Sequence, residues 1–248
     1  MPESLFHLRP FGRAEDLDLE FERADRPALV TALLERCSAA GDPAAWWTQP
    51  IGNRIAALLR IVALSEDSSE LTVRLRCPRP CGESFEVALP IDALGGNGAV
   101  TDPIPVTLAE GAVVAVRRPT GEDQRGWRSR GYSSQREATR AMIDTLVVDG
   151  HVTPDDESAL AALSEALAEH DPLVAFTVSC ACPACRVTSE LAIDLEGIAL
   201  ERLAARQRAL IQDVHVLALR YGWTEREILA IPPARRARYR SLTDEVAG

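Results

Sequence analysis

Two cysteine pairs, far apart in the chain, each lie in the bend between two short segments of alternating apolar residues. The two strand–knuckle–strand units are residues 71–89, with Cys77 and Cys81, and residues 174–195, with Cys182 and Cys185. Each knuckle offers two thiolates, and a structural zinc ion takes four ligands in a tetrahedron. The pattern therefore predicts that the two halves meet around one zinc ion. A site closed by four thiolates has no open position, so it favours a scaffold role over catalysis.

Two other cysteines leave the ligand set partly open. Cys180 alternates with Val178 and Phe176 along one face of its strand, which predicts a core residue, although Cys180 could replace Cys182 as a ligand. Cys37 lies in an expected helix and is interpreted as a buried core thiol. A redox interpretation of residues 182–185 (CPAC) is weakened because a strand-like segment follows, whereas reactive thiols usually lie at a helix N-terminus.

Composition restricts the classes of partner. The chain of 248 residues has a formal net charge of −10, and all 27 of its basic residues are arginines. An acidic chain repels the phosphate backbone, so nucleic acid is disfavoured as a partner. No apolar run approaches the roughly 20 residues that a membrane span needs. Six cysteines over this length are too sparse for a disulfide scaffold, which favours metal binding in the cytoplasm.

The order of patterns predicts an α+β fold with two zinc-ribbon-like units joined around one zinc site and helical N-terminal, middle and C-terminal segments. We expect three regions: an N-terminal helical segment over 1–69, a zinc-stapled β core over 70–196 with a helical insertion at about 119–170, and a helical docking tail over 197–248.

Capping signals mark several helix ends. Asp25 and Thr224 precede expected helices, Thr120 opens a capping box, and Gly222 is placed to end a long helix in the left-handed conformation. Thr153 followed by proline predicts a further helix start. Residues 104–118 are predicted to form a hairpin, and residues 134–148 a helix.

No residue pattern indicates catalysis. No serine or cysteine has a recognisable histidine and carboxylate setting, and no paired carboxylates stand out, so neither an enzyme nor a small-molecule substrate is expected. The stretch 117–140 mixes arginines with Trp127 and Tyr132, which would suit base stacking on nucleic acid. A solvated helix or a face for a protein partner is favoured there, because the chain is acidic overall.

Four stretches together resemble a known family. They are residues 50–60 (PIGNRIAALLR), 118–124 (RPTGEDQ), 171–185 with its DPL and CPAC elements, and 213–239, which carries DVHVLALRYGWTEREIL, an RR pair and a tyrosine. These stretches resemble the T4-like baseplate hub assembly (chaperone) proteins of contractile phage tails and their relatives in phage-tail-like contractile injection systems. The chain departs from the family pattern in the extra residue of the first knuckle, in Arg186 after the last knuckle cysteine, and in the additional Cys180.

The resemblance implies a non-enzymatic role in building the central hub of a baseplate. The expected partners are other baseplate, hub, spike or tail proteins, met in the cytoplasm during assembly or within the phage-like particle. The expected partner-binding residues are aromatic or apolar members of the C-terminal helices: Tyr221, Trp223, Ile228, Leu229 and Tyr239. A zinc-ribbon nucleic-acid-binding or transcription-associated protein is the alternative from another class.

Overall fold

The computed structural model describes residues 7–22, 25–39, 44–79, 81–94 and 102–245. Within these ranges the protein is a mixed α+β structure, with ten α-helices, one 3-10 helix and three small antiparallel sheets. The helices are η1 (Ala14–Asp18), α1 (Arg26–Cys37), α2 (Ala45–Thr48), α3 (Ile51–Glu66), α4 (Ile91–Leu94), α5 (Gly121–Ser129), α6 (Gln135–Leu146), α7 (Glu157–His170), α8 (Leu195–Tyr221), α9 (Glu225–Ala230) and α10 (Pro233–Glu245). The strands are β1 (Glu70–Arg76), β2 (Ser84–Pro90), β3 (Ile104–Thr107), β4 (Val113–Val116), β5 (Val147–Asp149), β6 (Thr177–Ala181) and β7 (Thr188–Ala192).

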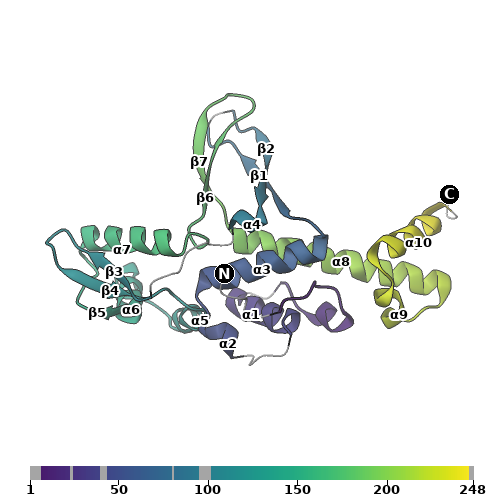
Figure 1. The fold of residues 1–248 in the computed structure, drawn as a ribbon, viewed down its shortest axis with the longest axis horizontal. Coiled ribbons are helices and arrows are strands. Elements are labelled where there is room, and N and C mark those ends of the chain that lie inside the picture. Colours follow the sequence, from purple (N-terminus) through teal and green to yellow (C-terminus); the bar gives the residue numbers. More distant parts are fainter. Residues whose placement is uncertain (1–6, 23–24, 40–43, 80, 95–101, 246–248) are drawn as a thin grey trace.

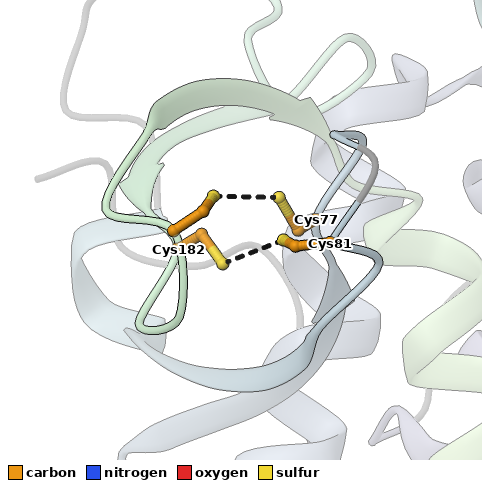
Figure 2. A group of neighbouring side chains, drawn as sticks. Cys77, Cys81 and Cys182 are labelled. Carbon is orange, nitrogen blue, oxygen red and sulfur yellow. Dashed lines mark hydrogen bonds between the residues drawn. The ribbon is translucent and has the colours of Figure 1, made fainter.

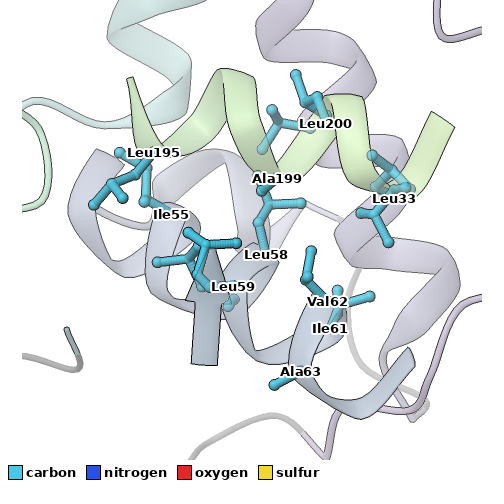
Figure 3. Close-up of a cluster of buried hydrophobic side chains, with 14 of the residues drawn as sticks. Leu33, Ile55, Leu58, Leu59, Ile61, Val62, Ala63, Leu195, Ala199 and Leu200 are labelled. Carbon is cyan, nitrogen blue, oxygen red and sulfur yellow. The ribbon is translucent and has the colours of Figure 1, made fainter. Parts of the chain in front are cut away.

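The main core lies between α1, α3 and the first half of α8. Figure 3 shows Leu33 of α1 and Leu58 of α3 in the same buried cluster as Leu195, Ala199 and Leu200 of α8. The apolar side chains of α3 recur at spacings of three and four residues, so one broad face of this helix is buried. Because α3 and α8 pack along each other, they join residues from the first and last parts of the chain.

Two hairpins stand on this helical layer and form what we call the hairpin arm (Figure 1). β1 pairs with β2, and β6 pairs with β7, each in antiparallel register. Along β1, Leu71, Val73 and Leu75 are buried and alternate with exposed residues, which places one face of the first hairpin on the main core. The turn ends of both hairpins lie at the far end of the arm (Figure 1).

The segment between the two hairpins forms a separate lobe with its own core. The sheet β3–β4–β5 packs its buried face, with Ile104, Val106 and Val114, against side chains of α6 and α7 such as Ile143 and Leu163. The hairpin expected over 104–118 is therefore present as β3 and β4. We call this part, residues 102–170, the insertion lobe.

Two boundaries in the insertion lobe differ from expectation. The predicted helix over 134–148 ends at Leu146, because the chain extends over Val147–Asp149 and pairs with β4. The helix predicted to start at Thr153 begins at Glu157 instead. Asp156 caps it through a carboxylate oxygen that accepts the backbone N–H of Ala159 at 3.0 Å. A carboxylate at this position also interacts favourably with the helix dipole.

The C-terminal helices form a lobe at the opposite end of the molecule from the insertion lobe (Figure 1). The 27-residue helix α8 runs out of the main core, and Gly222 ends it in the left-handed conformation with φ of 69°. Thr224 and Glu227 form the predicted capping box at the start of α9. Both of these helix-end predictions are confirmed. We call residues 206–245 the C-terminal lobe.

Candidate metal centre

The four predicted ligand cysteines come together at the turn ends of the two hairpins. Cys77 follows β1 and Cys182 follows β6, while Cys81 and Cys185 lie in the turns that lead into β2 and β7. All four Sγ atoms lie within 4.8 Å of one another. Figure 2 shows Cys77 and Cys81 of the first hairpin facing Cys182 of the second.

The distances between sulfurs fit a metal bound by four thiolates. Cys77 Sγ lies 3.8 Å from Cys185 Sγ, and Cys81 Sγ lies 3.8 Å from Cys182 Sγ. A regular tetrahedron with a zinc–sulfur bond of about 2.3 Å has an edge of about 3.8 Å. A disulfide would require about 2.05 Å between the sulfurs. The site is therefore compatible with a metal ion and contains no disulfide.

The two knuckles share a backbone arrangement. Cys77 donates its backbone N–H to the carbonyl of Glu83 at 2.8 Å, and Cys182 donates in the same way to Val187 at 3.1 Å. The residue after the second cysteine is left-handed in both knuckles, with φ of 59° at Gly82 and 60° at Arg186. Glycine adopts this conformation without strain, whereas arginine adopts it at a cost of about 1 kcal/mol.

Backbone N–H groups point at the sulfurs, as expected for a site that holds thiolates. The N–H of Cys185 is the main cause that lowers the pKa of Cys182, to about 7. At Cys77 the N–H of Arg79 also acts to lower the pKa. Burial and the neighbouring thiols outweigh it and raise the pKa of Cys77 to about 12. Protons must therefore leave the site before it holds four thiolates, and a bound cation would drive that loss.

The other two cysteines lie outside this cluster. Cys180 points toward the main core, against which it is half-buried, so the structure brings Cys182 rather than Cys180 to the site. Cys37 is fully buried in α1, and burial raises the pKa of its thiol to about 12. The CPAC segment leads into strand β7 and not into a helix. It therefore lacks the helix N-terminus on which reactive thiols usually depend.

Much of the arginine and aromatic stretch 117–140 is engaged within the protein. Arg117 forms two hydrogen bonds with Asp123, at 2.6 and 2.8 Å. The guanidinium of Arg125 lies 4.5 Å from the ring centre of Trp47, and the indole N–H of Trp127 donates to Thr145. These contacts hold α5 against its neighbours and leave fewer groups free for a nucleic acid.

Three of the sequence motifs behind the family resemblance meet at one junction between the main core and the insertion lobe. The backbone N–H of Ile51 donates to the carbonyl of Pro119 at 2.9 Å, and the N–H of Gly52 donates to the Asp171 carboxylate at 3.2 Å. A Cβ on Gly52 would lie 1.6 Å from Asp171 Oδ1, so only glycine fits. Burial is the main cause that raises the pKa of Asp171.

Arg54 is the centre of this junction, and the sequence reasoning missed its role. Its side chain is fully buried and donates to the carbonyl of Pro27 at 2.9 Å and to Thr31 Oγ1 at 2.8 Å. A Cβ on Gly121 would lie 1.3 Å from Arg54 Nη1, which explains the glycine of the RPTGEDQ motif. Burial lowers the pKa of Arg54 to about 10, so the guanidinium stays charged at neutral pH. Arginine is rarely a core residue, so its type alone did not predict its burial. The available sequence signal for a tightly packed junction was the presence of Gly52 and Gly121.

The residues predicted to bind partners lie in the C-terminal lobe with different exposures. The rings of Tyr221 and Trp223 stack at 4.5 Å between centres, and Tyr239 packs edge-on against both. Leu229 is half-buried, whereas Ile228 is fully buried and serves the interior of the lobe.

Comparisons with protein-family models, with curated proteins and with solved structures found no match to this chain. Across the described ranges, no helix is both long enough and apolar enough to cross a membrane.

Proposed function

We propose that this protein is a non-enzymatic structural or assembly protein of the baseplate hub of a contractile phage tail or tail-like injection system. One zinc ion, held by Cys77, Cys81, Cys182 and Cys185, would join two zinc-ribbon-like units. The observation that carries the scaffold proposal is the set of sulfurs spaced 3.8 Å apart across two hairpins that are distant in sequence. Four protein ligands leave no position for a substrate, as in structural zinc sites.

Zinc is the metal that this donor set favours. Soft thiolate ligands in a tetrahedral arrangement select zinc or iron–sulfur chemistry. The spacing of the sulfurs matches one ion with bonds of about 2.3 Å, because such a site has edges of about 3.8 Å. Binding at such a site contributes on the order of 10 kcal/mol to folding, since the site forms only in the folded chain.

The baseplate part of the proposal is supported by the resemblance of residues 213–239 to the family pattern, and by the position of this segment in a terminal lobe (Figure 1). A helical lobe at one end of an elongated molecule is well placed to contact another protein. The proposed partners are hub, spike or tail proteins, met in the cytoplasm during assembly or retained in the particle.

The alternative, a zinc-ribbon protein that binds nucleic acid, has weaker support in the hairpin arm. Arg74 pairs with Glu86 across the first hairpin at 3.3 Å. Arg76 donates to the backbone carbonyl of Gly82. Both guanidiniums are thus directed to groups of this chain, and the net charge of −10 opposes approach to phosphates.

Mass spectrometry of proteins that co-purify with the tagged full chain, after nuclease treatment at moderate salt, tests the proposal. Tail tube, spike or baseplate proteins are expected, together with about one zinc per chain by elemental analysis. Recovery of polymerase subunits, or of partners that depend on nucleic acid, would instead establish the alternative. The presence of the chain in intact particles would distinguish a component from a chaperone.

A further inference from the structure

The second half of α8 carries an exposed stripe of side chains, which we call the α8 stripe. Its members are Arg208, Ile211, His215 and Leu219, spaced by three or four residues and therefore on one helix face. All four are exposed, and the apolar members are prominent, with Leu219 at 76% and Ile211 at 48% exposure. This face is apolar at two positions where a solvated helix would carry polar residues.

The opposite face of α8 is already occupied by other parts of the protein, with Gly12 next to Leu210 and α10 next to Asp213. Leu210 and Leu217 are buried, and Asp213 accepts hydrogen bonds from Arg236 and Arg240 of α10 at 3.1 and 3.2 Å. Successive residues of a helix are rotated by about 100°, which puts these three residues on the far side from His215. The α8 stripe is thus free of the internal packing that fixes α9 and α10.

The C-terminal lobe is basic within an acidic protein. Residues 206–245 contain eight arginines and five acidic residues, while the rest of the chain contains 19 arginines and 32 acidic residues. Arg236 and Arg240 share Asp213, but five exposed arginines have no ion pair within the described residues: Arg208, Arg220, Arg226, Arg235 and Arg238. Of these, Arg208 belongs to the stripe and Arg220 follows Leu219 in α8, so unpaired positive charge lies next to the exposed aliphatic side chains of the stripe.

We propose that the α8 stripe docks an acidic amphipathic segment of a partner protein, an inference that rests on the proposed scaffold function and specifies its contact. Leu219 and Ile211 would pack against apolar side chains of that segment, and Arg208 and Arg220 would meet its carboxylates. Complementary charge of this kind raises the association rate and selects the partner. A helix laid along an exposed apolar stripe is a common mode of recognition.

A protein segment fits this surface better than a nucleic acid. Leu219 and Ile211 would have no role against phosphates. The aromatic rings that could stack on bases are engaged with each other, since Tyr221 and Trp223 lie face to face and Tyr239 packs against both. A second copy of this chain is also disfavoured, because a two-fold contact would set basic stripes against each other.

Photo-cross-linking tests the proposal in the full-length chain. A Leu219→p-benzoylphenylalanine variant, expressed in the cells from which the chain derives, is irradiated and the attached peptide is sequenced by mass spectrometry. The expected product is a segment of another protein in which Asp and Glu outnumber Lys and Arg. A Val113→p-benzoylphenylalanine variant, at an exposed site on the insertion lobe, is the positional control.

Charge reversal gives the second readout. Arg208→Glu with Arg220→Glu should lower the cross-link yield about tenfold, because both attractions become repulsions. Arg130→Glu with Arg140→Glu makes the same charge change on exposed residues of the insertion lobe, and we expect it to leave the yield within about twofold. Unchanged zinc content and circular dichroism establish that each variant is folded. A synthetic peptide with the sequence of the captured segment should bind the unaltered full-length chain, and this binding should weaken as the salt concentration is raised.

Four results would overturn the proposal: a yield no higher than at Val113, a basic attached segment, an adduct removed by nuclease, or an adduct with this chain itself. Failure of this kind is separable from failure of the proposed function. If baseplate proteins still co-purify with the Leu219 variant, the scaffold role stands and only the stripe is excluded. If no baseplate protein is recovered at all, the proposed function itself fails.

Discussion

Each of the two hairpins of the arm contributes two thiols to the cluster, but the hairpins are supported differently by the rest of the protein. On the first, Leu71, Val73 and Leu75 are 0–9% exposed and continue the main core into the arm. On the second, Val178 and Cys180 are only half-buried, and the outward-facing positions are exposed. The first hairpin is thus held mainly by apolar packing, whereas the second would depend more on the proposed metal ion. Two hairpins that supply equal numbers of ligands can therefore differ in their own stability.

The strongest test of the shared site is removal of one ligand. Cys182→Ser or Cys81→Ser should abolish tight zinc binding, at a cost on the order of 10 kcal/mol of metal-linked folding energy. Elemental analysis and thermal unfolding measure this change. Cys180→Ser is the matched control, because its sulfur lies outside the cluster, and we expect it to keep its zinc. Equal zinc content in all three variants would contradict the assigned ligand set.

Removal of the metal from the unaltered protein should affect the two hairpins unequally, as measured by their amide hydrogen exchange. After chelation, amide hydrogen exchange is expected to rise most in β6 and β7, because few buried apolar contacts hold them. Amides of β1 should stay protected by the main core. Exchange followed by mass spectrometry gives the comparison, and equal loss of protection in both hairpins would show that the asymmetry is wrong.

Val73 and Val178 each lie four residues before the first cysteine of their knuckle, and truncating them should lower the free energy of unfolding by different amounts. Val73→Ala removes buried atoms and should lower the free energy of unfolding by about 2 kcal/mol, given about 0.8 kcal/mol per buried CH₂ and a further cavity term. Val178→Ala should cost less than about 1 kcal/mol, since the side chain is half exposed. Denaturant unfolding of the zinc-loaded protein measures both. A larger cost at Val178 would reverse the comparison.

The smallest expected effect lies in the knuckle turns. Arg186→Gly should raise the free energy of unfolding by up to about 1 kcal/mol, because it removes the strain of a left-handed arginine. Gly82→Ala at the equivalent position should lower it by about 1 kcal/mol. The urea concentrations at which the two variants and the unaltered protein are half unfolded measure these changes. No gain in Arg186→Gly would mean that contacts of the arginine side chain offset its backbone strain.

The sequence predicted most features that depend on local chemistry, although α7 begins at Glu157 and not at Thr153. The spacing of Cys77, Cys81, Cys182 and Cys185 located the candidate metal centre, and the caps at Thr120 and Thr224 follow from hydrogen bonds within one turn. Features set by tertiary contacts were missed. β5 exists because β4 offers it a pairing edge. The burial of Arg54 depends on carbonyl oxygens that distant helices supply, which no local pattern reveals.

The order of the ligands along the chain has a consequence for synthesis on the ribosome. Cys77 and Cys185 are 108 positions apart, and the whole insertion lobe lies between them. At about 5–20 residues per second, roughly 5–20 s separate the emergence of the first pair of thiols from that of the second. During that interval the first hairpin holds only half a coordination sphere, while the insertion lobe is complete enough to fold on its own core. Capture of the proposed zinc ion would thus be a late event in biogenesis, because all four ligands are present only once the second knuckle has been translated.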